Sequence, residues 1–324
     1  MQTDFKSLIQ LNDFFKEEKT CHEFLANQIW EGGKAVCPFC DSTKVYVTKS
    51  RSTKPSKKDI PEYRCANKEC AKKFSVTKGT IFESTKVSLR TWFAAIYLIT
   101  THKKGISSHQ LATDLQVTQK TAWFLLHRVR EMYKESAPEL LRNVVEIDET
   151  FVGGKYKNKH ADKKKPGAQG STDKTIVFGA VQRHGKVKAM VVPDRKNNTI
   201  LNTMAENVQK GSLMVSDEYY HPDTFTPHNY NLVVMDHKVG EYVRGAFHTN
   251  TIEGFWSILK RGIYGIYHNV SPKHLQRYCD EFSYRYNTRK DKANERFTFT
   301  MQKAGEHRLR YVDLIKKEDS KAPE

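Results

Sequence analysis

The sequence has little that would place the protein in a membrane or outside the cell. No stretch approaches the roughly 20 uninterrupted apolar residues of a membrane span, and the start, MQTDFKSLIQLNDFF, lacks the charged-then-apolar pattern of a secretion signal. Cysteine is scarce, with six residues, and two close pairs in a chain without such a signal indicate metal ligation rather than disulfides. We therefore expect a soluble cytoplasmic protein with no membrane partner.

Acidic residues are also few compared with basic ones. The chain has 37 Asp and Glu against 54 Lys and Arg, which gives a formal net charge of +17. Such a balance favours a polyanionic partner, and nucleic acid is the first expectation. At 324 residues the chain is long enough for two or three domains of roughly 100 to 200 residues each.

The paired cysteines have the spacing of a zinc ribbon. Cys37 and Cys40 stand in CPFC, and Cys65 and Cys70 stand in CANKEC, so the gaps are two and four residues. Each pair supplies two thiolates, and four thiolates close a tetrahedral site around a structural Zn²⁺ ion. The segment 48–60 is rich in Lys, Arg and Ser, and we expect a solvated hairpin tip or loop there.

Residues 105–133 have the rhythm of a helix-turn-helix. A polar turn at 116–118 separates two helical patterns, with Ser107 or Ser108 as N-cap of the first and Thr118 as N-cap of the second. A plain helical hairpin is the alternative. In a helix-turn-helix, the start of the second helix faces the major groove, and the residues there are Gln119, Lys120 and Thr121.

From residue 144 onward the pattern changes from helical to strand-rich. Strands are predicted over 144–152, 175–181, 186–192, 213–215 and 230–235, and helices over 198–209, 250–263 and 272–286. Asp148 ends an apolar run in the first of these strands. A buried carboxylate costs several kcal/mol unless it is paired or binds a metal, so a capping or ion-paired Asp148 is the alternative to a ligand.

Two further acids stand where they can converge with Asp148. Asp217 follows the fourth strand and Glu253 lies on a late helix, which is the order of acids in a ribonuclease H-like core. Carboxylates suit Mg²⁺ or Mn²⁺, and two ions roughly 3.5 to 4 Å apart can clamp the attacking and leaving oxygens of a phosphodiester. Lys260, two turns after Glu253, would approach phosphate.

Several blocks together resemble a known family over nearly the whole chain. CPFC, FSVTKGTIFESTK, VEIDETFVGG, SDEYY, HTNTIEGFWSILKRGIYGIYH and HLQRYCDEFSYRYN are similar to DDE transposases of the insertion sequence 1595 family, the ISXO-like transposases. The resemblance implies that Asp148, Asp217 and Glu253 form the DDE triad and that Lys260 is the basic residue that follows it. It assigns no role to His248 or Trp256, or to Asn250, for which an N-cap is the preferred interpretation. These residues all lie in the block around Glu253.

The expected activity is metal-dependent DNA cleavage at insertion-element ends and strand transfer into target DNA. A ribonuclease H-like nuclease without strand transfer, and a zinc-ribbon DNA-binding regulator, are the alternatives. The expected partners are the terminal repeats and the target DNA of a prokaryotic nucleoid, bound by a homo-oligomer. Beyond the helix-turn-helix, the side chains expected on DNA are Lys163, Lys164, Lys165, Lys260 and Arg261.

The predicted fold is α/β, with a ribonuclease H-like catalytic core preceded by a zinc ribbon and a helix-turn-helix. Five segments are expected: N-terminal helices at 1–32, the ribbon at 33–82, the helix-turn-helix domain at 83–137, the catalytic domain at 138–300 and a C-terminal tail at 301–324.

Overall fold

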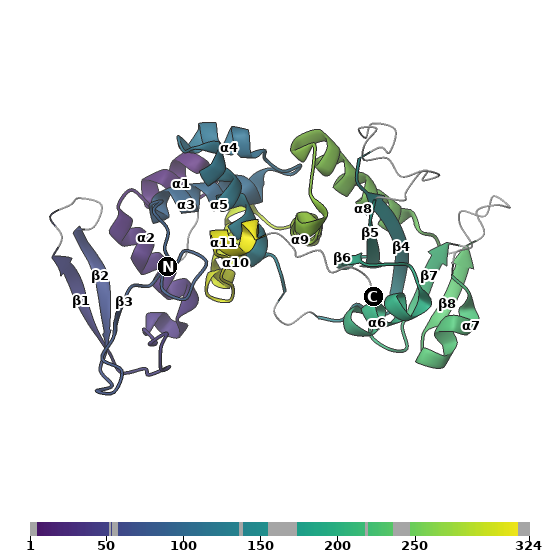
Figure 1. The fold of residues 1–324 in the computed structure, drawn as a ribbon, viewed down its shortest axis with the longest axis horizontal. Coiled ribbons are helices and arrows are strands. Elements are labelled where there is room, and N and C mark those ends of the chain that lie inside the picture. The colour runs from purple at the N-terminus through teal and green to yellow at the C-terminus, as the bar shows by residue number, and fades with distance from the viewer. Residues whose placement is uncertain are drawn as a thin grey trace. The chain divides into compact units, whose positions relative to one another are not determined.

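The computed structural model describes residues 5–51, 53, 58–135, 139–154, 174–217, 220–235 and 247–316 (Figure 1). The chain forms two compact units, a first unit of residues 1–134 and 290–324 and a second unit of residues 135–289. The predicted catalytic segment ran to residue 300, whereas the second unit ends at Arg289. None of the described helices is long and apolar enough to cross a membrane.

The first unit combines a small antiparallel sheet, ordered β1-β2-β3, with a group of helices. Its strands are β1 (Val45–Arg51), β2 (Lys58–Cys65) and β3 (Lys73–Phe74). Its helices are α1 (Leu8–Phe14), α2 (Glu18–Ile29), α3 (Leu89–Thr101), α4 (Ser108–Leu115), α5 (Gln119–Met132), α10 (Ala293–Gln302) and α11 (Tyr311–Ile315). The segment 48–60, expected as a tip or loop, therefore contributes to both arms of the β1-β2 hairpin.

Hydroxyl side chains fix where the helices of the helix-turn-helix segment begin. Ser107 accepts a hydrogen bond from the backbone N–H of Gln110, and Thr118 accepts one from that of Thr121. Each cap satisfies a donor that has no partner inside the helix. Between the helices, Gln116 adopts a left-handed conformation with φ 53° and ends α4. Of the two candidates for the first cap, Ser107 is the N-cap and Ser108 is the first helical residue, and the predicted cap at Thr118 is confirmed.

Aromatic rings from distant segments form the core of the first unit. The ring of Phe15 lies 4.7 Å from that of Phe93 on α3 and 5.1 Å from that of Phe24 on α2. Phe297 of α10 lies 5.9 Å from Phe93, and Phe5 lies 5.2 Å from Phe297. The residues after 290 therefore complete this core, and α10 is a structural part of the first unit.

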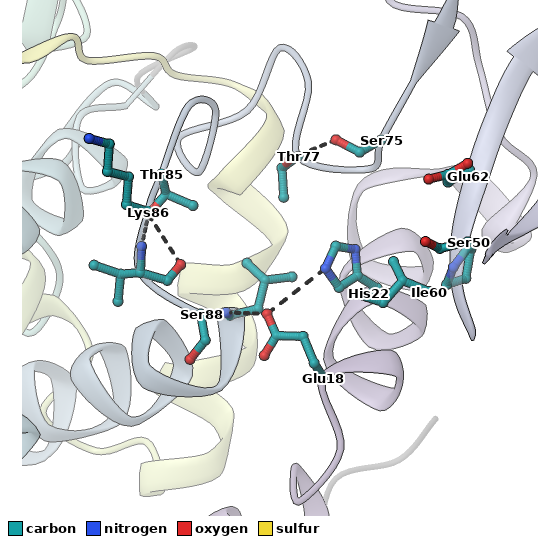
Figure 2. A pocket seen from close by; sticks show the side chains of 13 residues that line it. Glu18, His22, Ser50, Ile60, Glu62, Ser75, Thr77, Thr85, Lys86 and Ser88 are labelled. Carbon is teal, nitrogen blue, oxygen red and sulfur yellow. Dashed lines mark hydrogen bonds and ion pairs between the residues drawn. The ribbon is translucent and has the colours of Figure 1, made fainter. Parts of the chain in front are cut away.

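A cavity of about 560 Å³ lies between α2, the β1-β2 hairpin and the start of α3 (Figure 2). Glu18 closes one side, because its carboxylate accepts the backbone N–H groups of Leu89 and Arg90 at 2.6 and 3.2 Å. His22 is buried beside it, and this burial lowers the pKa of His22 to about 4. The imidazole is therefore neutral at physiological pH.

The second unit is built on a five-stranded sheet ordered β6-β5-β4-β7-β8. The pairs β4-β5 and β5-β6 are antiparallel, and the pairs β4-β7 and β7-β8 are parallel. The strands are β4 (Val144–Val152), β5 (Thr175–Gln182), β6 (Val187–Val192), β7 (Leu213–Asp217) and β8 (Asn231–Met235). The helices are α6 (Asn197–Asn207), α7 (Pro222–Phe225), α8 (Asn250–Gly262) and α9 (Pro272–Asn287), with a π-helical segment at Ile263–Tyr267.

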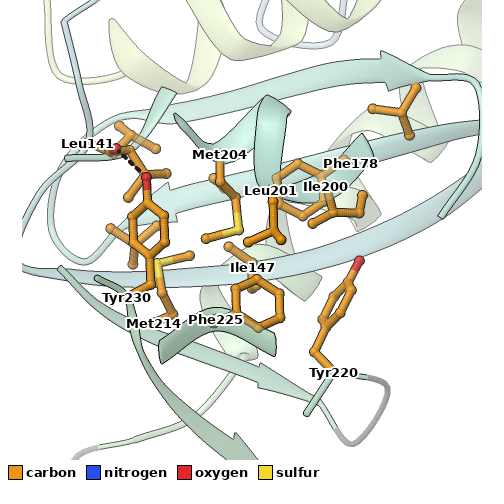
Figure 3. Close-up of a cluster of buried hydrophobic side chains, with 14 residues drawn as sticks. Leu141, Ile147, Phe178, Ile200, Leu201, Met204, Met214, Tyr220, Phe225 and Tyr230 are labelled. Atoms are coloured by element: carbon orange, nitrogen blue, oxygen red, sulfur yellow. Dashed lines mark hydrogen bonds between the residues drawn. The ribbon is translucent and has the colours of Figure 1, made fainter. Parts of the chain in front are cut away.

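Both faces of this sheet are covered by apolar contacts. Val145 and Ile147 point toward α6 and join the cluster drawn in Figure 3. Val152 of the same strand belongs to the opposite cluster, which includes Phe255 of α8 and Phe282 of α9. Because side chains alternate along a strand, the even-numbered residues of β4 face α8. Asp148 is one of them.

The structure corrects the interpretation of Asn250. The N-cap of α8 is Thr249, and Asn250 is the first helical residue. The Thr249 side chain makes no capping bond, because its hydroxyl instead donates to Glu253 Oε1 at 2.9 Å. The backbone N–H groups of Thr251 and Ile252, in the first turn of α8, donate instead to the carboxylate of Glu146 on β4.

Candidate functional site

Four cysteine sulfurs gather at the base of the β1-β2 hairpin. The Sγ atoms of Cys37, Cys40, Cys65 and Cys70 all lie within 4.8 Å of one another. The Cys37–Cys70 and Cys40–Cys65 distances are 3.7 and 3.6 Å. Thiolates at about 2.3 Å from a tetrahedral zinc ion are about 3.8 Å apart, so this donor set fits Zn²⁺. The cluster supports a structural zinc site.

The second candidate site begins with two aspartates on neighbouring parallel strands. The β4-β7 register pairs Val145 with Met214 and Glu146 with Val215. Asp148 and Asp217 each lie two residues beyond the last of these pairs, so they stand side by side where the β4-β7 ladder ends. Both are half-buried. The predicted strand at 213–215 is longer than expected and includes Asp217 as its last residue.

Both oxygens of Asp148 accept hydrogen bonds. Oδ1 accepts from the backbone N–H of Glu149 at 2.7 Å, and Oδ2 accepts from the indole Nε1–H of Trp256 at 2.9 Å. Trp256 can approach this closely because Asp148 pairs with Gly179 on β5. A Cβ at Gly179 would overlap the Trp256 ring, so the glycine creates the space that the indole fills.

The charge of Glu253 acts on Asp148, as does that of Asp217. Burial, together with the charges of Asp217 and Glu253, raises the pKa of Asp148 to about 6. Burial also raises the pKa of Glu149 to about 8, with added contributions from Asp148 and Asp217. Both shifts are those expected of carboxyl groups that are buried beside other acids.

The three acids are near enough to interact but do not form a closed ligand cage. Among the described residues, the four cysteines form the only group whose ligand atoms lie close enough together to hold an ion as the side chains stand. Glu253 is exposed on the first turn of α8, and its Oε1 accepts the Thr249 hydroxyl. Carboxylate oxygens are the hard donors that Mg²⁺ and Mn²⁺ prefer, so the chemistry of the set fits such an ion.

One acid at this site, Glu146, was missed by sequence reasoning. It is completely buried on β4 and accepts the backbone N–H groups of Thr251 and Ile252 at 2.9 and 3.1 Å. Arg183 donates to its Oε1 at 3.1 Å. The signal was present in VVEIDE, because period-two alternation places Glu146 on the same strand face as Asp148.

The remaining predicted residues are dispersed over both units. Lys260 and Arg261 lie in the last turn of α8, two turns from Glu253. Gln119 and Lys120 are exposed at the start of α5, where Thr121 is half-buried. Lys163, Lys164 and Lys165 lie outside the described residues.

The side chains of the first turn of α5 contact other parts of the chain. Gln119 donates to the Ser108 hydroxyl at 2.8 Å, and the hydroxyls of Thr118 and Thr121 lie 2.8 Å apart. The Lys120 ammonium lies 5.0 Å from the ring centroid of Tyr311.

In the second unit, His248 approaches the buried Glu146, with Nδ1 at 3.4 Å from Oε1.

Comparison with known proteins matches both candidate sites to one family. Residues 140–287 match the ISXO2-like transposase domain, and residues 16–73 match the transposase zinc-ribbon domain. Together the two matches span more than half of the chain. The protein therefore belongs to the ISXO2-like transposases, and its function is that of a transposase.

One curated relative and several solved structures are also similar. An uncharacterized protein in transposable element ISH50 of Halobacterium salinarum is 29% identical over 84% of this chain and 91% of its own length. The Mos1 strand transfer complex and a pre-cleavage Mos1 transpososome are 14% and 13% identical, with TM-scores of 0.27 and 0.26. Each covers 66% of this chain and 75% of the Mos1 chain.

Proposed function

We propose that Asp148, Asp217 and Glu253 are the catalytic triad of a DDE transposase that cleaves element ends and joins them to target DNA. The observation that carries the proposal is the β4-β7 register, which places Asp148 beside Asp217, with Glu253 on the helix that packs against the Asp148 face of the sheet. Ionised acids held near one another repel unless a cation lies among them.

The proposed catalytic unit is ribonuclease H-like. The order β6-β5-β4-β7-β8, with three antiparallel strands followed by two parallel ones, supports this interpretation. The central strand β4 carries Asp148, and its parallel neighbour β7 carries Asp217. Helix α8 packs on the face of the sheet toward which Asp148 points, and it carries Glu253.

The triad would hold Mg²⁺ or Mn²⁺, which when bound stabilises charge on a phosphodiester during its displacement. The chain's own residues prepare the site for this role. Trp256 fixes the orientation of Asp148, and Thr249 holds Glu253 by its Oε1. Lys260, in the last turn of α8, would approach a DNA phosphate.

The first unit is proposed to recognise the terminal repeats of the element. A helix-turn-helix of α4 and α5 would present Gln119, Lys120 and Thr121 to the major groove. At the ribbon, Phe39 is exposed and the ammonium groups of Lys72 and Lys78 lie 4.7 and 5.6 Å from its ring centroid. This aromatic and basic surface suits a nucleic acid backbone.

The proposed setting is the prokaryotic nucleoid, where a homo-oligomer would hold two element ends. The basic residues Lys163, Lys164 and Lys165, together with Lys260 and Arg261, would contact phosphates there. The net charge of +17 supports strong, salt-dependent binding to DNA.

The decisive experiment incubates the full chain with cloned element ends, Mg²⁺ and a supercoiled target plasmid. A joined product, with element ends covalently attached to the target, is the expected result. Cleavage without joining would indicate a nuclease, and binding without cleavage would indicate a regulator. Either result would overturn the proposal.

A further inference from the structure

We propose that Glu146 is a positioning residue for Glu253, because it anchors the first turn of α8 to the strand that carries Asp148. The inference rests on the proposed triad and adds a fourth acid with a different role. Glu146 is completely buried and both of its oxygens already accept hydrogen bonds from the chain, so it does not bind DNA or a metal ion itself. It would act through the helix that it holds.

The carboxylate of Glu146 takes the place of a helix cap. Oε2 accepts the backbone N–H groups of Thr251 and Ile252 at 2.9 and 3.1 Å, and Oε1 accepts the Thr251 hydroxyl at 2.8 Å. The first N–H groups of a helix have no partner inside the helix and carry partial positive charge. The N-cap residue Thr249 does not satisfy them with its side chain. Glu146 therefore fixes where α8 begins.

Arg183 locks this arrangement from the other side. Its Nη2 donates to Glu146 Oε1 at 3.1 Å and to the backbone carbonyl of His248 at 3.2 Å. One guanidinium thus ties the buried carboxylate to the segment that enters α8. Such charge-assisted bonds are stronger and more directional than neutral ones, so the helix start has little freedom to move.

The consequence for the triad follows from the alternation of β4. Glu146 and Asp148 are two residues apart and face α8 together. Glu253 comes one residue after Ile252, whose N–H group Glu146 holds. A single strand therefore sets the position of Asp148 directly and that of Glu253 through the helix start. An acid with a purely structural role could contact any turn of α8. Glu146 contacts the turn that carries the proposed ligand Glu253.

The test compares Mn²⁺ binding, measured by the loss of the free-ion electron paramagnetic resonance signal, in zinc-loaded, full-length variants. Glu146→Gln keeps the size of the side chain but removes its charge and turns one oxygen into a donor that faces other donors. We expect its Mn²⁺ affinity to fall by about 10- to 100-fold, as when a partner of a metal ligand is removed. Thr251→Ala, which removes only the 2.8 Å hydroxyl bond, should give a smaller loss in the same direction.

The matched control is Tyr230→Phe, which removes a buried hydrogen bond from the tyrosine hydroxyl to the Val208 carbonyl at 3.1 Å. Tyr230 belongs to the cluster on the α6 face of the sheet, so the variant should lose stability without losing Mn²⁺ affinity. If Glu146→Gln and Thr251→Ala bind Mn²⁺ as Tyr230→Phe does, Glu146 is only structural and the inference is wrong. Should Glu146→Gln fail to fold, Thr251→Ala alone decides.

Glu253→Gln separates failure of the inference from failure of the proposed function. If Glu253→Gln binds Mn²⁺ normally and still cleaves DNA, the triad itself is wrong. If Glu253→Gln loses both properties while the Glu146 and Thr251 variants keep Mn²⁺ affinity, only the positioning role is refuted.

Discussion

The indole N–H of Trp256 donates a 2.9 Å hydrogen bond to Asp148, across 108 positions of sequence. The bond joins α8 to β4 at the residue that the proposed chemistry needs most. It also lowers the pKa of Asp148, against the stronger effect of burial. The two elements that carry Asp148 and Glu253 are thus connected at two points, through Trp256 and through Glu146.

Trp256→Phe should impair the reaction more than the fold. The ring contacts of α8 largely remain, but the ionised form of Asp148 loses a charge-assisted bond of about 1.5 to 3 kcal/mol, which corresponds to a roughly 10- to 100-fold slower cleavage. The pH at which cleavage reaches half of its maximum should rise. Rate and pH profile for cleavage of a labelled element end measure both effects.

The control for this variant is Tyr264→Phe, which removes the hydrogen bond from an exposed tyrosine hydroxyl to the Gly153 carbonyl. We expect wild-type cleavage and an unchanged pH profile from it. Equal behaviour of the two variants would refute a special role for the indole N–H.

Gly179→Ala should displace α8 from the sheet. The new Cβ would overlap the ring of Trp256 and lie 2.9 Å from Ile252 Cδ1, and overpacking of this kind destabilises by about 1 to 3 kcal/mol. Gly254→Ala, also at the site but with nothing within 4 Å of the added carbon, should be neutral or stabilising, because alanine favours a helix. Urea unfolding of the two variants gives the comparison; equal stabilities would contradict the packing described for Trp256.

Removing a zinc ligand should unfold the ribbon and leave the second unit folded. Cys37→Ser or Cys70→Ser takes away a thiolate from a site whose binding supplies on the order of 10 kcal/mol in small zinc domains. Zinc content should fall well below one ion per chain, and binding to element ends should weaken. Cys21→Ser is the control, since Cys21 is buried against the carbonyl of Phe15 and lies outside the cluster. Full zinc content in Cys37→Ser would contradict the assignment.

Stability of the Mg²⁺-free protein should decrease as the pH rises from about 4 to 6. The pKa of Asp148 is raised from 3.8 to about 6, so the folded state holds a proton that the unfolded state has released in this window. The contribution of the Asp148 proton to the free energy of unfolding is fully present below pH 3.8 and is lost as the pH rises through 6. The loss is at most about 3 kcal/mol.

Denaturant unfolding at several pH values measures this loss, with Asp148→Asn as the comparison. The variant has no carboxyl group at this position, and its stability should vary less between pH 4 and 6. Added Mg²⁺ should restore much of the stability of the wild type at neutral pH. An identical pH dependence in both proteins would show that Asp148 does not carry the buried charge.

Local rules were sufficient for much of the fold. Ser107 and Thr118 were predicted as caps because a hydroxyl before a helical pattern satisfies a backbone donor within three residues. The same rule failed at Asn250, because the partner of the α8 donors is Glu146, 105 positions away from Thr251. A long-range cap leaves no trace in the sequence near the helix.

Long-range packing also explains what was missed at the C-terminus. The segment after residue 300 was expected as a tail, yet α11 lies there and Tyr311 packs with its ring 5.4 Å from that of Phe124 on α5. Arg128 of α5 donates to the Leu309 carbonyl at 2.9 Å. A short helix whose apolar residues contact a distant element has too little periodicity of its own to be recognised.

The central claim is that three acids carry the chemistry, and amide variants of the triad test it most directly. Asp148→Asn, Asp217→Asn and Glu253→Gln keep size but remove a charged ligand, so Mg²⁺-dependent cleavage should fall by several orders of magnitude. Stability should change little. At Asp148 the relief of charge repulsion is offset by the loss of one of the two bonds that its oxygens accept.

The control is Glu281→Gln, because Glu281 is a buried acid of α9 that accepts hydrogen bonds from Tyr267 and Arg285. Its amide should melt earlier but cleave normally when folded. The measurement is the single-turnover rate of Mg²⁺-dependent strand cleavage, paired with the melting temperature, for all four variants. The account predicts three inactive, stable triad variants and one active, destabilised control. Cleavage by Glu253→Gln at the wild-type rate, with Glu281→Gln folded but inactive, would contradict it.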